Sequence, residues 1–352
     1  MVVIDAQADS DGTRLALIDA SEAAEVQDWV SITYRQLSAG RFSGRMAAVD
    51  LAGVGLFHEC HDQVVSKTGA LPRGQCTVSF IDRGDSNARF SQFVIDGPDV
   101  AFFQPECDEF DIVVPAGRAT TYARIDQDEL LRKLAVLSPP LADQLLSCRG
   151  LQSLGLSSRA YLERAMHSLL ATGQGRMAGH AGIDPRALRR NLMEQILHAI
   201  TAAGDPRSGC APNLQGRRRA WRIVRAAREL MEARLRQGRV PDMVDLCART
   251  GVSERTLRNA FQDQLGYPPS VYLRVIRLNG VRAELLNPIP HLTSVTAAAT
   301  DWGFVQLGRF ASDYRSLFKE LPSVTLARAL GLNVQRSRAP SPGASQYLPK
   351  TL

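Results

Sequence analysis

The stretch "GVSERTLRNAFQDQLGYPPSVYL", residues 251–273, is repeated in outline 53 positions later as "FVQLGRFASDYRSLFKELPSVTL", residues 304–326. The large apolar side chains of the two copies coincide, and so does a closing Pro-Ser-Val. The matched pairs are Leu257 with Phe310, Phe261 with Tyr314, Leu265 with Phe318, Pro269 with Pro322, Ser270 with Ser323 and Val271 with Val324. A repeat of this length indicates a supersecondary unit that the chain uses twice.

Each copy predicts two helices joined by a tight turn. A short apolar helix precedes each copy, at residues 243–250 and 294–302. In the first copy, Gly251 can adopt the positive φ that a tight turn requires, and Ser253 is placed to cap the next helix. The apolar residues of that helix recur at every fourth position and therefore form one buried stripe. Gly266 then supplies the residue that ends the helix.

The other face of this second helix is polar and basic. Arg, Asn and Gln are side chains that pair with the edges of guanine and adenine through two hydrogen bonds in the major groove. The alternative interpretation is an ordinary solvated face, because surface helices are commonly rich in Arg. The candidate DNA-binding residues of the first unit are Ser253, Arg255, Arg258, Asn259 and Gln262.

Charge divides the chain of 352 residues into two parts, in keeping with a two-domain length. Residues 1–212 hold 20 Lys and Arg against 26 Asp and Glu, which is a net charge of −6. Residues 213–338 hold 21 against 10, which is +11, and Lys350 completes the overall +6. A basic domain is the electrostatic footprint of a protein that binds a polyanion, so the charge favours DNA binding over the alternative.

Between the two units, "SVYLRVIRLNGVRAELL", residues 270–286, predicts one long helix that holds them apart. This arrangement strongly resembles the AraC/XylS family of bacterial transcription regulators, over residues 214–330. The resemblance implies a sequence-specific regulator, an activator, with double-stranded DNA and RNA polymerase as partners, and with neither an enzymatic activity nor a cofactor. It also implies that Arg255, Arg258 and Asn259 read bases.

The second unit departs from the commoner family pattern. Gly308 and Ala311 lie in its recognition helix, and Ser312 stands where many members carry Arg. We therefore expect weaker base reading from this unit and a larger share of phosphate contacts. Its candidate DNA-binding residues are Gln306, Arg309, Ser312 and Asp313.

The front half of the chain has a different pattern. Short apolar runs broken by Gly, Pro and Asp fill residues 31–123, and segments with helical spacing follow in residues 127–202. The predicted fold class is α+β: an N-terminal, cupin-like β-barrel sensor with following helices, then an all-α domain of two helix-turn-helix units joined by a long helix. The family resemblance implies that the front domain binds a small-molecule effector or forms a homodimer, with the helices at 159–170 and 189–200 as dimerisation elements.

The predicted domain boundaries follow these changes of pattern. A linker is expected where Gly, Pro and Ser replace any periodicity, and disorder where apolar residues become too few to form a core. The expected segments are an N-terminal arm at 1–30, the β-rich domain with its helices at 31–203, the linker at 204–216, the DNA-binding domain at 217–332 and a disordered tail at 333–352.

The sequence "FHECHDQ", residues 57–63, concentrates side chains that bind metals. In a strand, His58 and Cys60 face one way while Glu59 and His61 face the other, so a single strand cannot present all four to one ion. One alternative function is a cupin-like metalloenzyme in which His58 and Cys60 join ligands from elsewhere, but no third ligand stands at a recognisable spacing. We therefore expect no metal site. The other alternative is a non-specific architectural DNA binder.

The expected location of the protein is the cytoplasm. The chain begins with acidic residues where a signal peptide needs basic ones, and it contains no run of about 18 apolar residues. Its cysteines are scattered without a Cys-x-x-Cys pair, which is typical of free thiols: Cys60, Cys76, Cys107, Cys148, Cys210 and Cys247. We therefore expect a soluble protein without a membrane partner.

Overall fold

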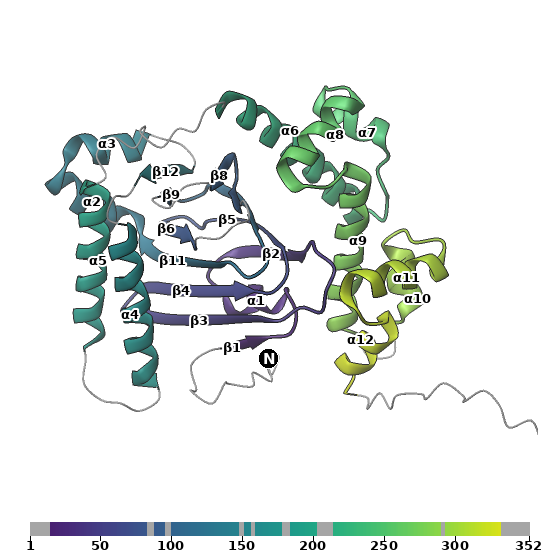
Figure 1. Cartoon of the computed structure of the whole chain (residues 1–352), viewed down its shortest axis with the longest axis horizontal. Coiled ribbons are helices and arrows are strands. Elements are labelled where there is room, and N and C mark those ends of the chain that lie inside the picture. The colour runs from purple at the N-terminus through teal and green to yellow at the C-terminus, as the bar shows by residue number, and fades with distance from the viewer. Residues whose placement is uncertain are drawn as a thin grey trace, which may run out of the picture.

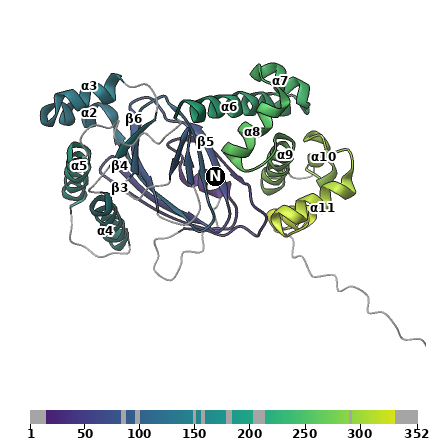
Figure 2. The same ribbon diagram turned by 45° about the horizontal axis from the view of Figure 1, so that its top comes forward.

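The computed structural model describes residues 15–82, 88–95, 100–147, 151–155, 159–177, 184–202, 214–289 and 293–331. A sheet-rich front domain occupies the middle of the molecule (Figure 1). The helices between residues 127 and 202 lie on one side of it, and the helices of the C-terminal domain lie on the other, as the rotated view also shows (Figure 2). The mixed α and β class that the sequence predicts is confirmed.

The front domain consists of two sheets in which every strand pair is antiparallel. In spatial order, the first sheet contains β1 (Leu15–Leu17), β3 (Gly44–Leu51), β4 (Val54–His61), β11 (Ala119–Asp126), β6 (Gln75–Ile81), β9 (Val100–Gln104) and β12 (Gln152–Gly155). The second contains β2 (Ser31–Gln36), β5 (Val65–Ala70), β10 (Glu109–Val114), β7 (Ala88–Phe90) and β8 (Phe93–Ile95). Side chains from both sheets meet between them: Lys67 of β5 donates a hydrogen bond to Glu59 of β4.

The sheets do not close into a barrel, so the prediction of a cupin-like barrel is wrong on this point. Among the described residues, strand pairing ends at β1 and β12 in one sheet and at β2 and β8 in the other. One physical reason lies on the free edge of β2, where the backbone N–H and C=O of Gln36 bond to the side chain of Asn279. An edge whose polar groups are satisfied in this way does not need another strand.

Residues 15–26, which the sequence pattern assigns to an N-terminal arm, are part of the front domain. β1 pairs with β3, and α1 (Glu22–Val26) follows it. Leu17 and Ala23 are buried in a cluster that includes Met46 and Phe57. Burial of these apolar side chains attaches the segment to the sheet, although its many polar residues obscure this in the sequence.

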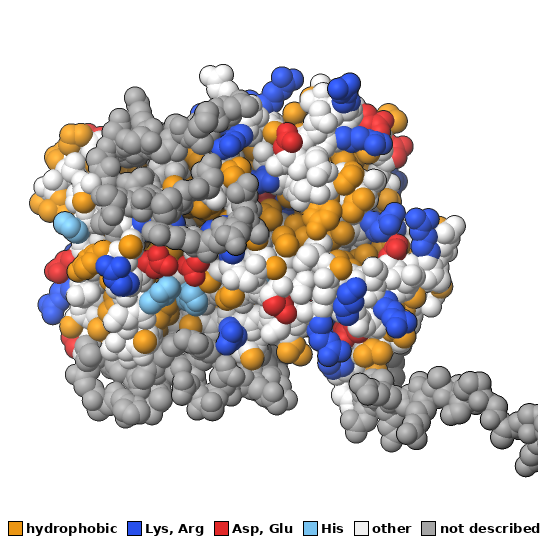
Figure 3. Space-filling model, in the orientation of Figure 1, with side chains coloured by type: hydrophobic (Ala, Val, Ile, Leu, Met, Phe, Trp, Pro, Cys, Tyr) orange, Lys and Arg blue, Asp and Glu red, His pale blue; other side chains and the backbone are white. Residues whose placement is uncertain are grey.

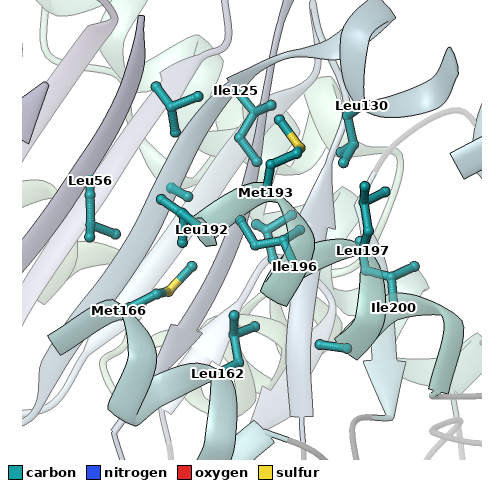
Figure 4. Packing of buried hydrophobic residues seen from close by; sticks show 14 of the residues in the cluster. Leu56, Ile125, Leu130, Leu162, Met166, Leu192, Met193, Ile196, Leu197 and Ile200 are labelled. Atoms are coloured by element: carbon teal, nitrogen blue, oxygen red, sulfur yellow. The ribbon is translucent and has the colours of Figure 1, made fainter. Parts of the chain in front are cut away.

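Four helices cover the outer face of the first sheet: α2 (Gln127–Leu137), α3 (Pro139–Ser147), α4 (Arg159–Met177) and α5 (Pro185–Ala202). Leu162 and Met166 of α4 and Leu192 and Ile196 of α5 lie in one cluster with Ile125 of β11 (Figure 4). The two helices predicted as dimerisation elements therefore bury their apolar faces within the chain. A homodimer formed through them would have to use their opposite, more polar faces.

The C-terminal domain contains the two predicted helix-turn-helix units. Its helices are α6 (Leu214–Arg236), α7 (Met243–Thr250), α8 (Glu254–Leu265), α9 (Pro269–Leu286), α10 (Val295–Asp301), α11 (Leu307–Phe318) and α12 (Pro322–Ala329). α7 and α8 form the first unit, α10 and α11 form the second, and α9 runs between them (Figure 1). The predicted tail at 333–352 and most of the predicted linker lie outside the described residues, whereas residues 214–216 begin α6. None of the described helices is long and apolar enough to cross a membrane.

We expect Ile196→Ala to destabilise the front domain by about 2–5 kcal/mol, because Ile196 is fully buried and its truncation leaves a cavity. Urea unfolding monitored by circular dichroism measures this change. Glu194→Ala, on the exposed face of the same helix, is the control and should change stability by less than about 0.5 kcal/mol. Equal effects of the two substitutions would contradict the packing of α5 on the sheet.

Candidate DNA-binding interface

The first unit has the turn that its sequence predicts. Gly251 ends α7 in the left-handed conformation, with φ at 66°. Ser253 caps α8, its hydroxyl accepting a hydrogen bond from the backbone N–H of Thr256. Leu257 and Phe261 of α8 are fully buried. One face of α8 is therefore fixed in the core, and the other is left free for a partner.

The first unit's candidate residues all lie on the exposed face of α8 or at its start: Ser253, Arg255, Arg258, Asn259 and Gln262. Arg258 donates two hydrogen bonds to Oε1 of Glu254, at 3.0 and 2.6 Å. Both side chains of this pair are more than half exposed, so it contributes little free energy and can be exchanged for a DNA contact. Gln262 donates to the carbonyl of Gly266 and so also caps the helix end.

The second unit has the same geometry with different side chains. Phe310, Tyr314 and Phe318 form its buried stripe, with successive ring centroids 5.8 and 4.7 Å apart. Lys319 ends α11 with φ at 59°, at the position where the first unit has Gly266. Burial of this aromatic stripe fixes the orientation of α11. Burial of Leu257 and Phe261 fixes the orientation of α8 in the same way.

Three of the four candidates in the second unit are exposed: Gln306, Arg309 and Ser312. Asp313 is only partly exposed, and its Oδ2 lies 3.8 Å from Nε of Arg274 on α9. Asp313 is therefore placed to hold an arginine rather than to extend freely from the surface.

Helix α9 holds the turn of the second unit through Trp302. A Cβ atom at Gly280 would lie 2.2 Å from the Trp302 ring, so only glycine permits this approach. Arg277 donates to the carbonyl of Trp302 at 2.7 Å, and the Trp302 indole donates to Glu284 at 3.2 Å. These contacts tie the second unit to the helix that also packs against the first.

The front domain bonds to α9 and to the second recognition helix. Asn279 of α9 accepts from the backbone N–H of Gln36 and donates to its C=O, each at 2.9 Å. The backbone N–H of Gly40 donates to the carbonyl of Leu317, in the last turn of α11, at 2.8 Å. Sequence reasoning missed Asn279; its only signal is that it is the one amide side chain in a predicted helix composed mainly of apolar residues and arginines.

Arg282 of α9 forms a buried ion cluster at the same boundary. Its guanidinium donates to Asp19 of the front domain and, at 2.7 Å, to Glu320 of the second unit. Burial alone would raise the pKa of Glu320, but the Thr325 hydroxyl and Arg282 hold that pKa below its ordinary value. The carboxylate of Glu320 is therefore stabilised in its charged form by partners that are buried with it.

The first recognition helix is also held from the front domain. Arg89 of β7 donates to Gln264 and, at 3.2 Å, to the carbonyl of Asp263. Both acceptors lie near the C-terminal end of α8, as Leu317 does in α11. The front domain therefore contacts both recognition helices near their C-terminal ends, away from the N-terminal residues predicted to read bases.

A second buried charge pair lies between the two sheets. Lys67 donates to Glu59 and, at 3.1 Å, to the hydroxyl of Thr120, and Tyr34 donates to Glu59 at 2.7 Å. Burial alone would raise the pKa of Glu59, but Lys67 and His61 lower it to about 2. A cavity of about 40 Å³ adjoins this pair. It has room for a few water molecules only.

The two faces of "FHECHDQ" separate as the strand alternation predicts. Glu59 and His61 are buried between the sheets. His58 and Cys60 lie on the opposite face of β4, where Nδ1 of His58 is 2.9 Å from the hydroxyl of Thr121. His58 and Cys60 therefore do not line the space between the sheets. Within the described part of the chain, no three or more His, Cys, Asp and Glu side chains are grouped so as to hold a metal ion.

Comparisons with known proteins match the C-terminal region. A family model described as "Helix-turn-helix domain" matches residues 246–328. The "XylDLEGF operon transcriptional activator" of Pseudomonas putida is 37% identical over 147 residues, which is 42% of this chain and 40% of that protein. The "Probable thc operon regulatory protein" of Rhodococcus erythropolis is 41% identical over 105 residues, 30% of this chain and 31% of that protein.

Among solved structures, a probable AraC family transcriptional regulator from Rhodopseudomonas palustris is 41% identical in the matched region. The match covers 31% of this chain and 97% of that chain, and the TM-score is 0.28. The chain belongs to the AraC/XylS family. Members of the family are transcription regulators and not enzymes. The match to the XylDLEGF operon transcriptional activator spans about 40% of the length of that protein.

We expect Asn279→Ala to loosen this family member's front domain from α9. The substitution leaves the N–H and C=O of Gln36 without these partners, at a cost of about 1–3 kcal/mol. Hydrogen exchange measured by mass spectrometry should show faster exchange in β2. Asn259→Ala, at an exposed position of α8, is the control and should leave that exchange unchanged. Unchanged protection of β2 in Asn279→Ala would contradict the contact.

We expect Glu59→Gln to destabilise the front domain by about 3–5 kcal/mol, because Lys67 is left as a buried charge without its carboxylate. Burial already lowers the pKa of Lys67, so the loss should shrink as pH rises and Lys67 becomes neutral. Urea unfolding at several pH values measures both effects. The double variant Glu59→Gln with Lys67→Met should recover most of the stability, and failure to recover it would contradict the pairing.

Proposed function

We propose that this chain is a sequence-specific transcription activator that binds double-stranded DNA with both α8 and α11. The observation that carries the proposal is that two recognition helices, each with an exposed polar or basic face, are attached to the same helix α9. In the space-filling view, Lys and Arg side chains are frequent on the part of the surface that α6–α12 occupy (Figure 3). Two helices on one frame suit successive major grooves on one side of a duplex.

The proposed base-reading residues of the first unit are Arg255, Arg258 and Asn259. Their support is exposure on one face of α8, together with side chains that match guanine and adenine edges. Ser253 and Gln262 flank them and are placed for additional polar contacts. In the second unit, Gln306, Arg309 and Ser312 are exposed, and Asp313 contributes through Arg274.

The proposal extends to the front domain, which we infer senses a small-molecule effector or forms a homodimer, with the regulator acting on RNA polymerase in the cytoplasm. The printed names of several relatives, as operon transcriptional activators, support activation. Hydrogen bonds join the front domain to the C-terminal domain from Gln36, Gly40 and Arg89. They support regulation by the front domain, because a change in its conformation would alter its contacts with α9 and the recognition helices. The predicted linker at 204–216 stays a proposal, and its last residues, 214–216, are the first of α6.

The most direct test of sequence-specific binding is selection of bound duplexes from random DNA, at a stated salt concentration. We expect a motif of two half-boxes whose centres lie about one helical turn, 10–10.5 base pairs, apart. A non-specific architectural binder would enrich no motif. That result would reject the proposal.

We expect Arg258→Ala to weaken binding to the selected site by about 1–3 kcal/mol and to relax the preference at one base pair. Fluorescence anisotropy with a series of duplexes, each changed at one position, measures both effects. Arg132→Ala, at an exposed position of α2 in the front domain, is the control and should bind every duplex as the unchanged protein does. An unchanged preference in Arg258→Ala would remove this residue from the reading surface.

A further inference from the structure

The start of the second recognition helix exposes apolar side chains. Val305 is 90% exposed, more than any other large apolar side chain in the described part of the chain, and Leu307 is 40% exposed. The core beneath them is filled by other residues, since the rings of Phe304 and Phe310 pack with centroids 4.9 Å apart. Neither side chain is therefore needed to complete the fold.

The same surface lacks the long polar side chains of the first unit. The 53-residue offset places Gly308, Ala311 and Ser312 where the first unit has Arg255, Arg258 and Asn259. At Gly308, no atom beyond its chain neighbours and the helix's own backbone lies within 4 Å of the position that a Cβ would occupy. A partner can therefore approach the backbone of α11 more closely than that of α8. Over these positions α11 therefore carries only small side chains.

A basic groove adjoins this apolar surface. It has a volume of about 230 Å³, and three of its lining residues are Arg274 and Arg277 of α9 and Arg309 of α11. Burial and the neighbouring Arg274 lower the pKa of Arg277. An anion in the groove would relieve the repulsion between these arginines. Asp313 holds Arg274 at the groove's edge, and Arg277 is fixed by the Trp302 carbonyl.

The groove and the apolar surface share residues at the start of α11. Val305, Gln306 and Arg309 line the groove, and Leu307 and Gly308 lie between them in the chain. A backbone phosphate seated among the arginines would therefore place the edges of neighbouring bases against α11. In the major groove, the only apolar group on a base edge is the C5-methyl of thymine.

We propose that the second unit reads thymine methyl groups through Val305 and Leu307, with Gly308 permitting close approach and the Arg274–Arg277–Arg309 groove holding the adjacent phosphate. The inference rests on the proposed function, because it requires a DNA site with two half-boxes. It replaces the expectation that the second unit mostly grips phosphate. The hydrogen-bonding unit and the methyl-reading unit would then recognise different kinds of base pair.

Replacement of thymine by deoxyuridine, which removes only the methyl group, tests the inference on the full chain. With the selected duplex, deoxyuridine in the second half-box should weaken binding about fourfold for each methyl that is buried. In the first half-box, the same replacement of a thymine paired with an adenine that Asn259 reads should have no effect, because the amide contacts the adenine edge and not the methyl group. A second half-box without thymine, or one that tolerates deoxyuridine throughout, would overturn the inference.

The variant Val305→Ala links the effect to its residue. In this variant, deoxyuridine in the second half-box should weaken binding less than it does in the unchanged protein, and the loss of the fourfold effect is the expected result. Val136→Ala, which alters an 84% exposed valine in the front domain, is the matched control and should keep the full deoxyuridine effect. An undiminished effect in Val305→Ala would overturn the assignment.

Arg274→Ala tests the phosphate groove. It should weaken binding to the selected and to unrelated duplexes by the same factor, and it should reduce the salt dependence by about one phosphate contact. A loss confined to one sequence, or an unchanged salt dependence, would overturn the assignment. Failure of the chain to prefer any duplex would reject the proposed function itself, whereas normal selectivity without a methyl effect rejects only this inference.

Discussion

The guanidinium of Arg282 is the contact on which the arrangement of the whole molecule depends. It lies on α9 and is almost fully buried, and it joins Asp19 of the front domain to Glu320 of the second helix-turn-helix unit. Its guanidinium also lies 4.5 Å from the centre of the Phe318 ring, next to the end of the second recognition helix. Because a buried charge without partners is strongly destabilising, these groups must stay together while the protein is folded. One side chain thus fixes three segments far apart in sequence.

The remaining contacts at this boundary follow the same logic. Asn279, three residues before Arg282 in α9, takes the place of a neighbouring strand on the edge of β2. Arg228 of α6 is buried against Asp111 of β10 and makes a further link on the side of the first unit. The C-terminal domain therefore holds its two recognition helices, α8 and α11, at a fixed separation. The front domain contacts α8 and α11 near their C-terminal ends and leaves their N-terminal residues open to DNA.

Local features of the sequence predicted the two helix-turn-helix units well. Gly251, Ser253 and the spacing of Leu257 and Phe261 define a turn, a cap and a buried stripe through contacts between near neighbours. The contacts between domains had no comparable signal, because Asp19 and Arg282 are 263 residues apart and neither stands in a motif. Closure of the sheets was also beyond the pattern, since alternation predicts strands but not where an edge stops pairing. In "FHECHDQ", alternation predicted the two faces but not which one points inward.

The candidate site shows the same division. Exposure of Arg255, Arg258 and Asn259 follows from helical periodicity and was predictable. The role of Asp313 was not, because its partner Arg274 lies on another helix. Val305 has no signal of a DNA contact in the sequence, because valine lacks the hydrogen-bonding groups that indicate base reading. Only its exposure in the folded chain distinguishes it from nearby apolar residues that lie in the core, such as Phe310.

The measurement that tests the central claim most directly is binding to duplexes in which the distance between the two half-boxes is changed. If α9 and the front domain hold α8 and α11 at one separation, insertion of 5 or of 10 base pairs should reduce the affinity to that of a duplex with a single half-box. A 5-base-pair insertion turns the second half-box to the other side of the duplex, and a 10-base-pair insertion moves it a full turn away on the same side. Retention of the full affinity after the 10-base-pair insertion would show that the two units move independently, and would contradict the account.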